Sequence, residues 1–323
     1  MSLVTVLLLA ACAAKPTGPL AYVTNERDGT ITVIDTATDE VVNTIVVGAR
    51  PRGVRLSPDG RLVYVALSTP SGKTYDPEEN KIAAVDVESG RVVSKYEAGS
   101  DPEQLAVSRD GARLYASNED AGTATVTDVQ TGRTLATLVV GIEPEGVTAS
   151  PDGRWVYVTA ETSNTVSVID TEAGRVADTF IVDSRPRDTA FSPDGARAYV
   201  TTEIGRTLHV VDTATHKVVR TVEVPPGEGV KPMGVAVSPD GRRVYVATGR
   251  GNSVVVFDAE TFEPLTTITV GRRVWGLALT PDGRKLYAAN GLSNDVSVID
   301  TSENRVVKTV KAGDGPWGIA VGR

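Results

Sequence analysis

Residues 144–182, PEGVTASPDGRWVYVTAETSNTVSVIDTEAGRVADTFIV, decide the fold of this chain. The stretch contains four short runs rich in Val, Ile, Thr and aromatic residues, which favour β-strands. Turn sequences separate the first run from the second (150–153, SPDG) and the third from the fourth (170–174, DTEAG). The pattern predicts a four-stranded antiparallel meander of about 40 residues. Because one such sheet cannot bury both of its faces alone, it needs neighbours of the same kind.

The rest of the chain repeats this unit. The SPDG turn recurs, with small variations, six times, starting at Ser57, Ser108, Ser150, Ser192, Ser238 and Thr280. The aspartate that ends a strand of the Val-x-Val-x-Asp type recurs seven times, at Asp35, Asp86, Asp128, Asp170, Asp212, Asp258 and Asp300. The chain begins inside a repeat, and residues 316–321 resemble the first strand of one, residues 144–149. We therefore expect an all-β, seven-bladed β-propeller with four-stranded antiparallel blades, closed by a C-terminal strand that pairs with the N-terminal blade.

Composition limits the chemistry that this protein can perform. The chain has 323 residues and a net charge of -8, so it is not built around a general phosphate-binding surface. A single cysteine excludes an intrachain disulfide, and two histidines exclude a metal centre rich in His or thiolate ligands. No cofactor is predicted.

The N-terminus has the pattern of an export signal. Residues 3–11 form an apolar run that is too short to span a bilayer, which takes about 20 residues, but has the length of a signal-peptide core. Residues 9–12, LAAC, resemble a bacterial lipobox. This predicts a signal peptide, lipobox and tether in residues 1–19, a single propeller in residues 20–323, and a periplasmic protein anchored to the membrane by a lipid on Cys12. No Lys or Arg precedes the run, and a cytosolic protein with an apolar N-terminus is the alternative.

Two insertions indicate which face of the propeller carries the function. Most marker aspartates are 42 residues apart, but Asp35 and Asp86 are 51 apart, and Asp212 and Asp258 are 46 apart. The extra residues fall in 68–80 and 225–231, in loops that emerge on the same face of a propeller. Variable loops on a rigid scaffold often carry function, so we expect the working face there. Neutral drift is the alternative.

The segments that enter the seven innermost strands lie on this face, at the mouth of the central channel. Their side chains form an acidic, a basic and an apolar sector. The candidate ligand-binding residues are Asp101, Glu103, Glu143 and Glu145, then Arg50, Arg52, Arg185 and Arg187, and then Met233, Trp275 and Trp317 with Arg273 beside them. The tryptophans offer flat apolar area, and the charged groups orient a polar ligand.

Two other interpretations of the mouth stay open. In the first, the charges form a structural ring of ion pairs, in which Glu103 and Glu145 contact Arg52 and Arg187. In the second, the four carboxylates hold a hard cation such as Ca²⁺. No catalytic residue is predicted. His209 lies in a predicted strand and His216 in the turn after it, away from the mouth, so Ser-His-Asp and Cys-His catalysis have no base.

The chain resembles a known family in its repeat motifs. Residues 22–25 (YVTN) and 199–202 (YVTT), the SPDG turns and the three VIDT segments at 33–36, 168–171 and 298–301 are similar to the YVTN-repeat propellers. Residues 25–30, 51–57, 101–104, 142–146 and 231–234 resemble, more narrowly, propellers associated with pyrroloquinoline quinone (PQQ)-dependent catabolism.

The resemblance implies a non-catalytic, exported binding or scaffold protein. It would be an accessory to periplasmic PQQ-dependent (quinoprotein) alcohol catabolism, a monomer that binds a quinoprotein partner or a small ligand at the channel mouth. The first alternative is a lactonase-like hydrolase on the same fold, which would need Glu103, Glu145, Arg52 and Arg187. The second is a nucleic-acid-binding propeller that uses the mouth arginines with Arg272, and the overall acidity counts against it.

Overall fold

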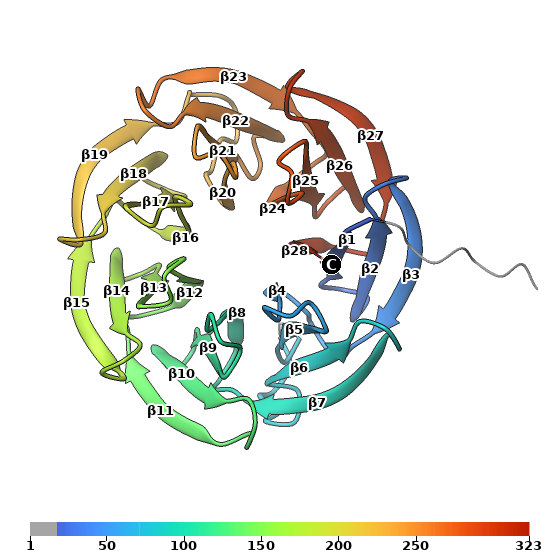
Figure 1. The fold of residues 1–323 in the computed structure, drawn as a ribbon, viewed down its shortest axis with the longest axis vertical. Helices are drawn as coiled ribbons and strands as arrows, with labels where there is room; N and C mark the ends of the chain where they lie inside the picture. The colour runs from blue at the N-terminus through green and yellow to red at the C-terminus, as the bar shows by residue number, and fades with distance from the viewer. Residues whose placement is uncertain (1–17, 71, 323) are drawn as a thin grey trace, which may run out of the picture.

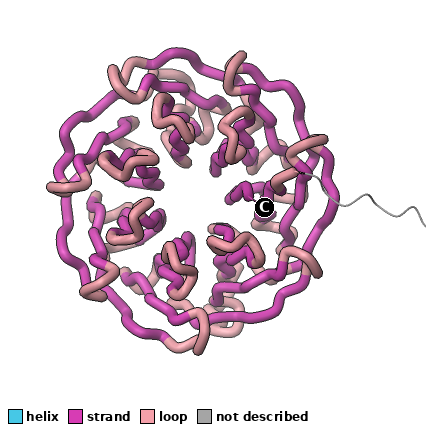
Figure 2. Tube along the Cα trace, in the orientation of Figure 1, coloured by secondary structure: helices cyan, strands magenta, loops and turns pink. Residues whose placement is uncertain are grey.

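The computed structural model describes residues 18–70 and 72–322, and its strands form seven four-stranded antiparallel sheets around a central axis (Figure 1). The seven-bladed propeller expected from the repeats is confirmed. Regular structure in these residues is entirely strand (Figure 2), and none of it is a helix able to cross a membrane. Cys12 and the predicted lipobox lie outside the described residues.

The blades follow one another in chain order, each running from the channel outwards. The strands of the closing blade are β28 (Pro316–Gly322), β1 (Leu20–Asn25), β2 (Thr30–Asp35) and β3 (Glu40–Val46). The next three blades are β4 (Val54–Leu56), β5 (Leu62–Leu67), β6 (Lys81–Asp86) and β7 (Arg91–Glu97); β8 (Pro102–Val107), β9 (Arg113–Asn118), β10 (Thr123–Asp128) and β11 (Thr134–Val139); and β12 (Pro144–Ala149), β13 (Trp155–Ala160), β14 (Thr165–Asp170) and β15 (Arg175–Ile181). The last three are β16 (Pro186–Phe191), β17 (Arg197–Thr202), β18 (Thr207–Asp212) and β19 (Lys217–Glu223); β20 (Val235–Val237), β21 (Arg243–Ala247), β22 (Ser253–Asp258) and β23 (Pro264–Thr269); and β24 (Val274–Leu279), β25 (Lys285–Asn290), β26 (Asp295–Asp300) and β27 (Arg305–Lys311).

The two ends of the described chain share one blade. Strand β28 pairs antiparallel with β1, with Tyr22 opposite Ala320 and Leu20 opposite Gly322. The C-terminal strand therefore supplies the innermost strand of a sheet whose other three strands come from the N-terminal side, as expected. This pairing leaves no blade without an inner strand and closes the ring.

The hydrophobic core lies between the blades. The same position of each second strand carries a tyrosine that is at most 1% exposed: Tyr22, Tyr64, Tyr115, Tyr157, Tyr199, Tyr245 and Tyr287. Each of the seven apolar clusters joins side chains from two adjacent blades. Burial between sheets thus stabilises the ring as a whole and holds the inner strands at fixed distances around the channel.

The SPDG turns have the geometry that their residues favour. In the first copy, the Ser57 hydroxyl donates to Asp59 Oδ1 at 2.7 Å and accepts from the Leu62 backbone N–H at 2.9 Å. The Gly60 N–H donates to the Ser57 carbonyl at 2.9 Å, and Gly60 has φ 70°. Serine and aspartate bond the local backbone while glycine takes the positive φ, so these turns belong to the scaffold.

Both insertions emerge on the face that carries the channel mouth. Residues 68–80 connect β5 to β6, and residues 225–231 precede β20. Asn80 Oδ1 accepts a hydrogen bond from the Asp101 N–H at 3.0 Å, and Lys231 Nζ lies 2.9 Å from Glu203 Oε1. The ends of the insertions therefore contact the charged groups that surround the mouth.

Candidate functional site

One half of the mouth is a cluster of ion pairs around Arg50 and Arg52. Arg50 lies 3.4 Å from Glu26 and 3.3 Å from Glu103, and it also pairs closely with Asp101. Arg52 lies 2.9 Å from Glu26 and is in direct contact with Glu103. Glu103 is fully buried, so its charge is balanced by arginines and not by solvent.

The opposite half repeats this arrangement around Arg185 and Arg187. Arg187 lies 3.1 Å from Glu145 and is in direct contact with Glu161, and its side chain is only 9% exposed. Arg185 lies 2.5 Å from Glu161 and 3.2 Å from Glu203. The predicted contacts of Glu103 with Arg52 and of Glu145 with Arg187 are therefore present. These charges satisfy one another, which fits the interpretation of the mouth as a structural ring.

Two predicted mouth residues are outside this network. Glu143 accepts a hydrogen bond from Thr162, and the structure gives it no ion pair. Arg273 has no carboxylate at ion-pair distance among the described residues, and its guanidinium lies 4.7 Å from the Trp275 ring. The four carboxylates of the cation alternative do not form one group among the described residues, since Glu143 and Glu145 are absent from the acidic cluster and Glu145 pairs with Arg187.

A smaller acidic group does form. The carboxylates of Asp101, Glu103 and Glu119 lie within 4.8 Å of one another. Burial, with the nearby charge of Glu145, raises the pKa of Glu103 and of Glu119, and the arginines oppose the shift. Arg50 and Arg52 already neutralise Asp101 and Glu103, so the group is part of the ion-pair ring.

The apolar sector contains a pair of stacked tryptophans. The rings of Trp275 and Trp317 are 5.8 Å apart with an interplanar angle of 28°. Arg187 lies 5.6 Å from the Trp275 ring and Arg52 lies 5.4 Å from the Trp317 ring, both at cation–π distance. Met233 is buried beside them. The mouth residues of the three sectors therefore contact one another around the channel.

A second layer of residues lies directly below the mouth, at positions where no site was predicted. The inner segments of the seven blades can be aligned at Pro51, Pro102, Pro144, Pro186, Pro232, Val274 and Pro316. Two residues after this position, five blades have a glycine and two do not: Gly53, Gln104, Gly146, Asp188, Gly234, Gly276 and Gly318. The glycines allow the inner strands to approach closely, since a Cβ on Gly146 would lie 2.5 Å from the Arg187 carbonyl and one on Gly234 2.5 Å from the Trp275 carbonyl. Gln104 and Asp188 are the exceptions, and both line the channel.

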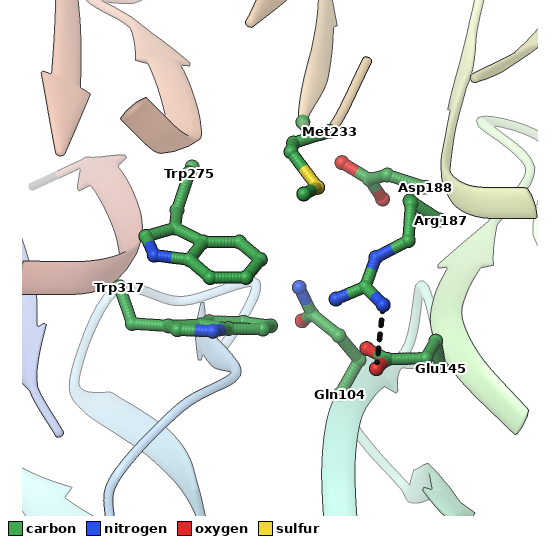
Figure 3. A pocket seen from close by; sticks show the side chains of 9 residues that line it. Gln104, Glu145, Arg187, Asp188, Met233, Trp275 and Trp317 are labelled. Atoms are coloured by element: carbon green, nitrogen blue, oxygen red, sulfur yellow. Dashed lines mark ion pairs between the residues drawn. The ribbon is translucent and has the colours of Figure 1, made fainter. Parts of the chain in front are cut away.

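Gln104 and Asp188 help to line a small pocket with Glu145, Arg187, Met233, Trp275 and Trp317 (Figure 3). The free volume is about 30 Å³, which is room for one or two water molecules. Trp317 Nε1 and Gln104 Oε1 are buried and have no hydrogen-bond partner among the described residues. An indole N–H donates and an amide oxygen accepts, so the two groups are suited to holding water or hydroxyl groups here.

A larger chamber of about 370 Å³ continues down the channel from this pocket. It shares Gln104, Asp188 and Gly276 with the pocket, and residues from all seven blades line it. Its walls include Phe191, Leu277 and Ile319, and its charged groups are Asp188 and Arg55. This volume is in the range of small-molecule sites, about 300–1,000 Å³.

Asp188 differs from Glu103 and Glu145 of the mouth, which are paired with arginines. It accepts hydrogen bonds from the backbone N–H groups of Thr189 at 2.9 Å and Val235 at 3.2 Å, and no cation forms an ion pair with it among the described residues. Burial raises the pKa of Asp188, while Arg55, the two N–H groups and Arg187 oppose the shift. Asp188 is thus a carboxylate at the junction of a water-sized pocket and a ligand-sized chamber.

The close approach at the glycine positions can be tested at the ring closure. A Cβ on Gly318 would clash with the Arg52 carbonyl oxygen, so Gly318→Ala is expected to lower the free energy of unfolding by about 1–3 kcal/mol. Urea unfolding measures this change. Gly227→Ala is the control, because a Cβ there meets only Val230 Cγ2, at 3.1 Å, and an equal loss in both variants would contradict the explanation.

Two family models match the sequence. The choice-of-anchor I domain matches residues 10–184, which is more than half of the chain. The chain belongs to the choice-of-anchor I domain family. The model of the lactonase, 7-bladed β-propeller, matches residues 182–316, which include Arg187, Asp188, Met233 and Trp275 of the pocket. No curated protein matches the chain.

Solved structures confirm the architecture. Kuenenia stuttgartiensis hydrazine synthase is 21% identical and has a TM-score of 0.78 over 92% of this chain and 99% of that one. A functionally unknown protein from Desulfotomaculum acetoxidans is 20% identical, with a TM-score of 0.78 over 94% and 99% of the two chains. A Bacteroides fragilis protein described as a candidate 6-phosphogluconolactonase is 20% identical, with a TM-score of 0.79 over 96% and 100%. At these identities the likeness shows the fold alone.

These comparisons correct the preferred functional hypothesis. The prediction of a non-catalytic scaffold accessory to quinoprotein alcohol catabolism is wrong, because the model that matches residues 182–316 is that of a lactonase. The resemblance is confirmed at the level of the lactonase-type seven-bladed propeller, and the narrower likeness to YVTN-repeat and PQQ-associated propellers stays a prediction. The nucleic-acid alternative also loses support, since Arg50, Arg52, Arg185 and Arg187 are paired with carboxylates.

Proposed function

We propose that this protein is a lactonase-type hydrolase whose reaction takes place in the central channel, at Asp188. The proposal rests on one observation: the segment that matches the lactonase model also contains a carboxylate of the channel cavities. The lactonase model matches residues 182–316, and this segment supplies Asp188, a carboxylate that lines both the pocket and the chamber and has no ion-pair partner among the described residues. The neighbour described as a candidate 6-phosphogluconolactonase has the same fold, which is compatible with this activity.

Asp188 is better suited to act as a general base than the carboxylates of the mouth. Glu103 and Glu145 each contact an arginine, so the guanidinium groups occupy carboxylate oxygens that would otherwise face a water molecule. In the part of the chain that the structure describes, the Asp188 carboxylate accepts hydrogen bonds from backbone N–H groups alone, and burial favours its protonated form. A general base works best when its pKa lies near the working pH, so the raised pKa of Asp188 favours this role.

The geometry supports a direct attack by water. A water molecule in the small pocket would donate to Asp188 and to Gln104 Oε1 and accept from Trp317 Nε1, while the lactone ring occupies the chamber below. Asp188 takes a proton as the water oxygen bonds to the lactone carbonyl carbon. The ring C–O bond then breaks, and the leaving ring oxygen receives that proton from Asp188. The product is a hydroxy acid, which ionises to a carboxylate.

A turnover assay tests this proposal. Purified protein is mixed with a panel of five- and six-membered lactones, neutral and phosphorylated, and acid release is followed at constant pH. The proposal predicts ring opening above the spontaneous rate for at least one lactone. If every lactone opens at its spontaneous rate, the chain is not a lactonase.

The pH dependence should reveal the buried base. Asp188 must be deprotonated to accept a proton, so kcat/KM is expected to fall as the pH decreases through its pKa. Because burial raises this pKa, the acid limb should lie above about 3.9, the usual value for aspartate. Initial rates at constant ionic strength measure the profile. A flat profile down to that value would rule out Asp188 as the base.

A further inference from the structure

Arg55 occupies a channel position at which all six of the remaining blades have a small side chain. It lies in β4, four residues after Pro51, and the equivalent residues of the other blades are Ala106, Thr148, Ala190, Ala236, Ala278 and Ala320. Arg55 lines the lower chamber together with Asp188, which comes from a blade that is not adjacent in the ring (Figure 1). Arg55 therefore introduces one long cationic side chain at a level of the channel that is otherwise lined by small residues.

Few groups of the protein balance the positive charge of Arg55 or accept hydrogen bonds from it. Nη1 donates to the Val54 carbonyl at 2.9 Å, and no carboxylate lies at ion-pair distance among the described residues. By contrast, Arg52 and Arg187, in the mouth above, each contact at least two carboxylates. Burial lowers the pKa of Arg55, and the charge of Asp188 only partly opposes this shift. Arg55 is half-buried, and a guanidinium that faces a channel with free N–H donors is suited to bind an anion.

We infer that Arg55 makes the lower chamber a binding site for an organic carboxylate, and that its ligand is the hydroxy acid produced by ring opening. The identity of the acid rests on the proposed function, whereas the anion site rests on Arg55 and the chamber alone. A guanidinium binds a carboxylate through two parallel hydrogen bonds. Because Asp188 and Arg55 line the same chamber, a carboxylate generated at Asp188 forms within the compartment that Arg55 serves.

Direct binding measurements test the site without any turnover. Isothermal titration of the full protein with gluconate, a six-carbon hydroxy acid, is compared with titration with sorbitol, which has no carboxylate. Gluconate should bind to the wild type, and Arg55→Met should weaken this binding by about 10- to 100-fold, as expected for a hydrogen-bonded charge. Arg55→Lys keeps the charge without the two-pronged geometry and should give an intermediate loss. Sorbitol binding should not depend on Arg55.

The control is Arg61→Met, which removes an exposed arginine of the same blade and should leave gluconate binding unchanged. Circular dichroism and thermal unfolding establish that the variants fold. Absence of gluconate binding by the wild type, or equal binding by the wild type and a folded Arg55→Met, would overturn the inference. If gluconate binding depends on Arg55 but no lactone is hydrolysed, the anion site stands and the proposed function fails. If lactones are hydrolysed but gluconate binding does not depend on Arg55, the proposed function stands and the anion site fails.

Discussion

Asp188→Asn is expected to reduce kcat for lactone hydrolysis by about 10²–10⁴-fold, the usual contribution of a general base. Asparagine has nearly the shape of aspartate and keeps one acceptor oxygen, so it retains one of the two hydrogen bonds from the Thr189 and Val235 backbone N–H groups, which donate to different oxygens of Asp188. It cannot take a proton from water at neutral pH. The structure of the channel should therefore persist while the chemical step is lost, and initial rates with the best lactone of the panel measure the effect.

Asp178→Asn is the matched control for this variant. Asp178 lies on β15, an outermost strand, where its side chain is exposed and far from the channel. It should retain the rate of the wild type within about twofold. If Asp188→Asn keeps a comparable rate while its thermal unfolding is normal, another group must be the base.

Arg187→Met is expected to lower the free energy of unfolding by about 3–5 kcal/mol. The substitution leaves Glu145 and Glu161, which are 4% and 2% exposed, without their central cation. It also removes the cation–π contact with Trp275. Urea unfolding measures this loss. It is the largest effect on stability that we expect from a single residue of the mouth, because Glu145 stays buried without its arginine and Glu161 keeps only Arg185.

Two comparisons separate this effect from a general cost of losing an arginine. Arg305 pairs with Glu303 on the surface, where both side chains are more than half exposed, so Arg305→Met should change stability by less than about 1 kcal/mol. Adding Glu145→Gln and Glu161→Gln to Arg187→Met should restore part of the stability. Equal losses for the two arginine variants, or no recovery in the triple variant, would contradict a buried ion-pair ring.

The fold was predictable because its determinants are local and repeated. The SPDG turns and the strand-ending aspartates mark each blade in the sequence, and the similarity of residues 316–321 to residues 144–149 identifies the closing strand. The arrangement of the mouth followed from topology, since each inner strand begins on the same face. The pairing of Arg52 with Glu103 and of Arg187 with Glu145 was therefore accessible without coordinates.

The candidate site was harder to find, for a physical reason. Charged residues at the mouth dominate the sequence pattern, but whether they are available to a ligand depends on distances that the sequence does not contain. The signal for Asp188 and Gln104 was nevertheless present, because both interrupt a column of glycines that close packing of the inner strands requires. Arg55 likewise interrupts a column of alanines with one threonine. In a repeat protein, deviations from the scaffold residue at one position indicate function better than clusters of charge.

The position of a bound lactam tests the central claim most directly, since a lactam has the ring and the carbonyl of a lactone but resists hydrolysis. The measurement is a crystal structure of the protein with the lactam analogue of its best lactone substrate. We expect the ring in the lower chamber, with the carbonyl carbon facing a water molecule that is hydrogen-bonded to Asp188. A lactam bound anywhere else, with the channel at Asp188 free of ligand, would contradict the account.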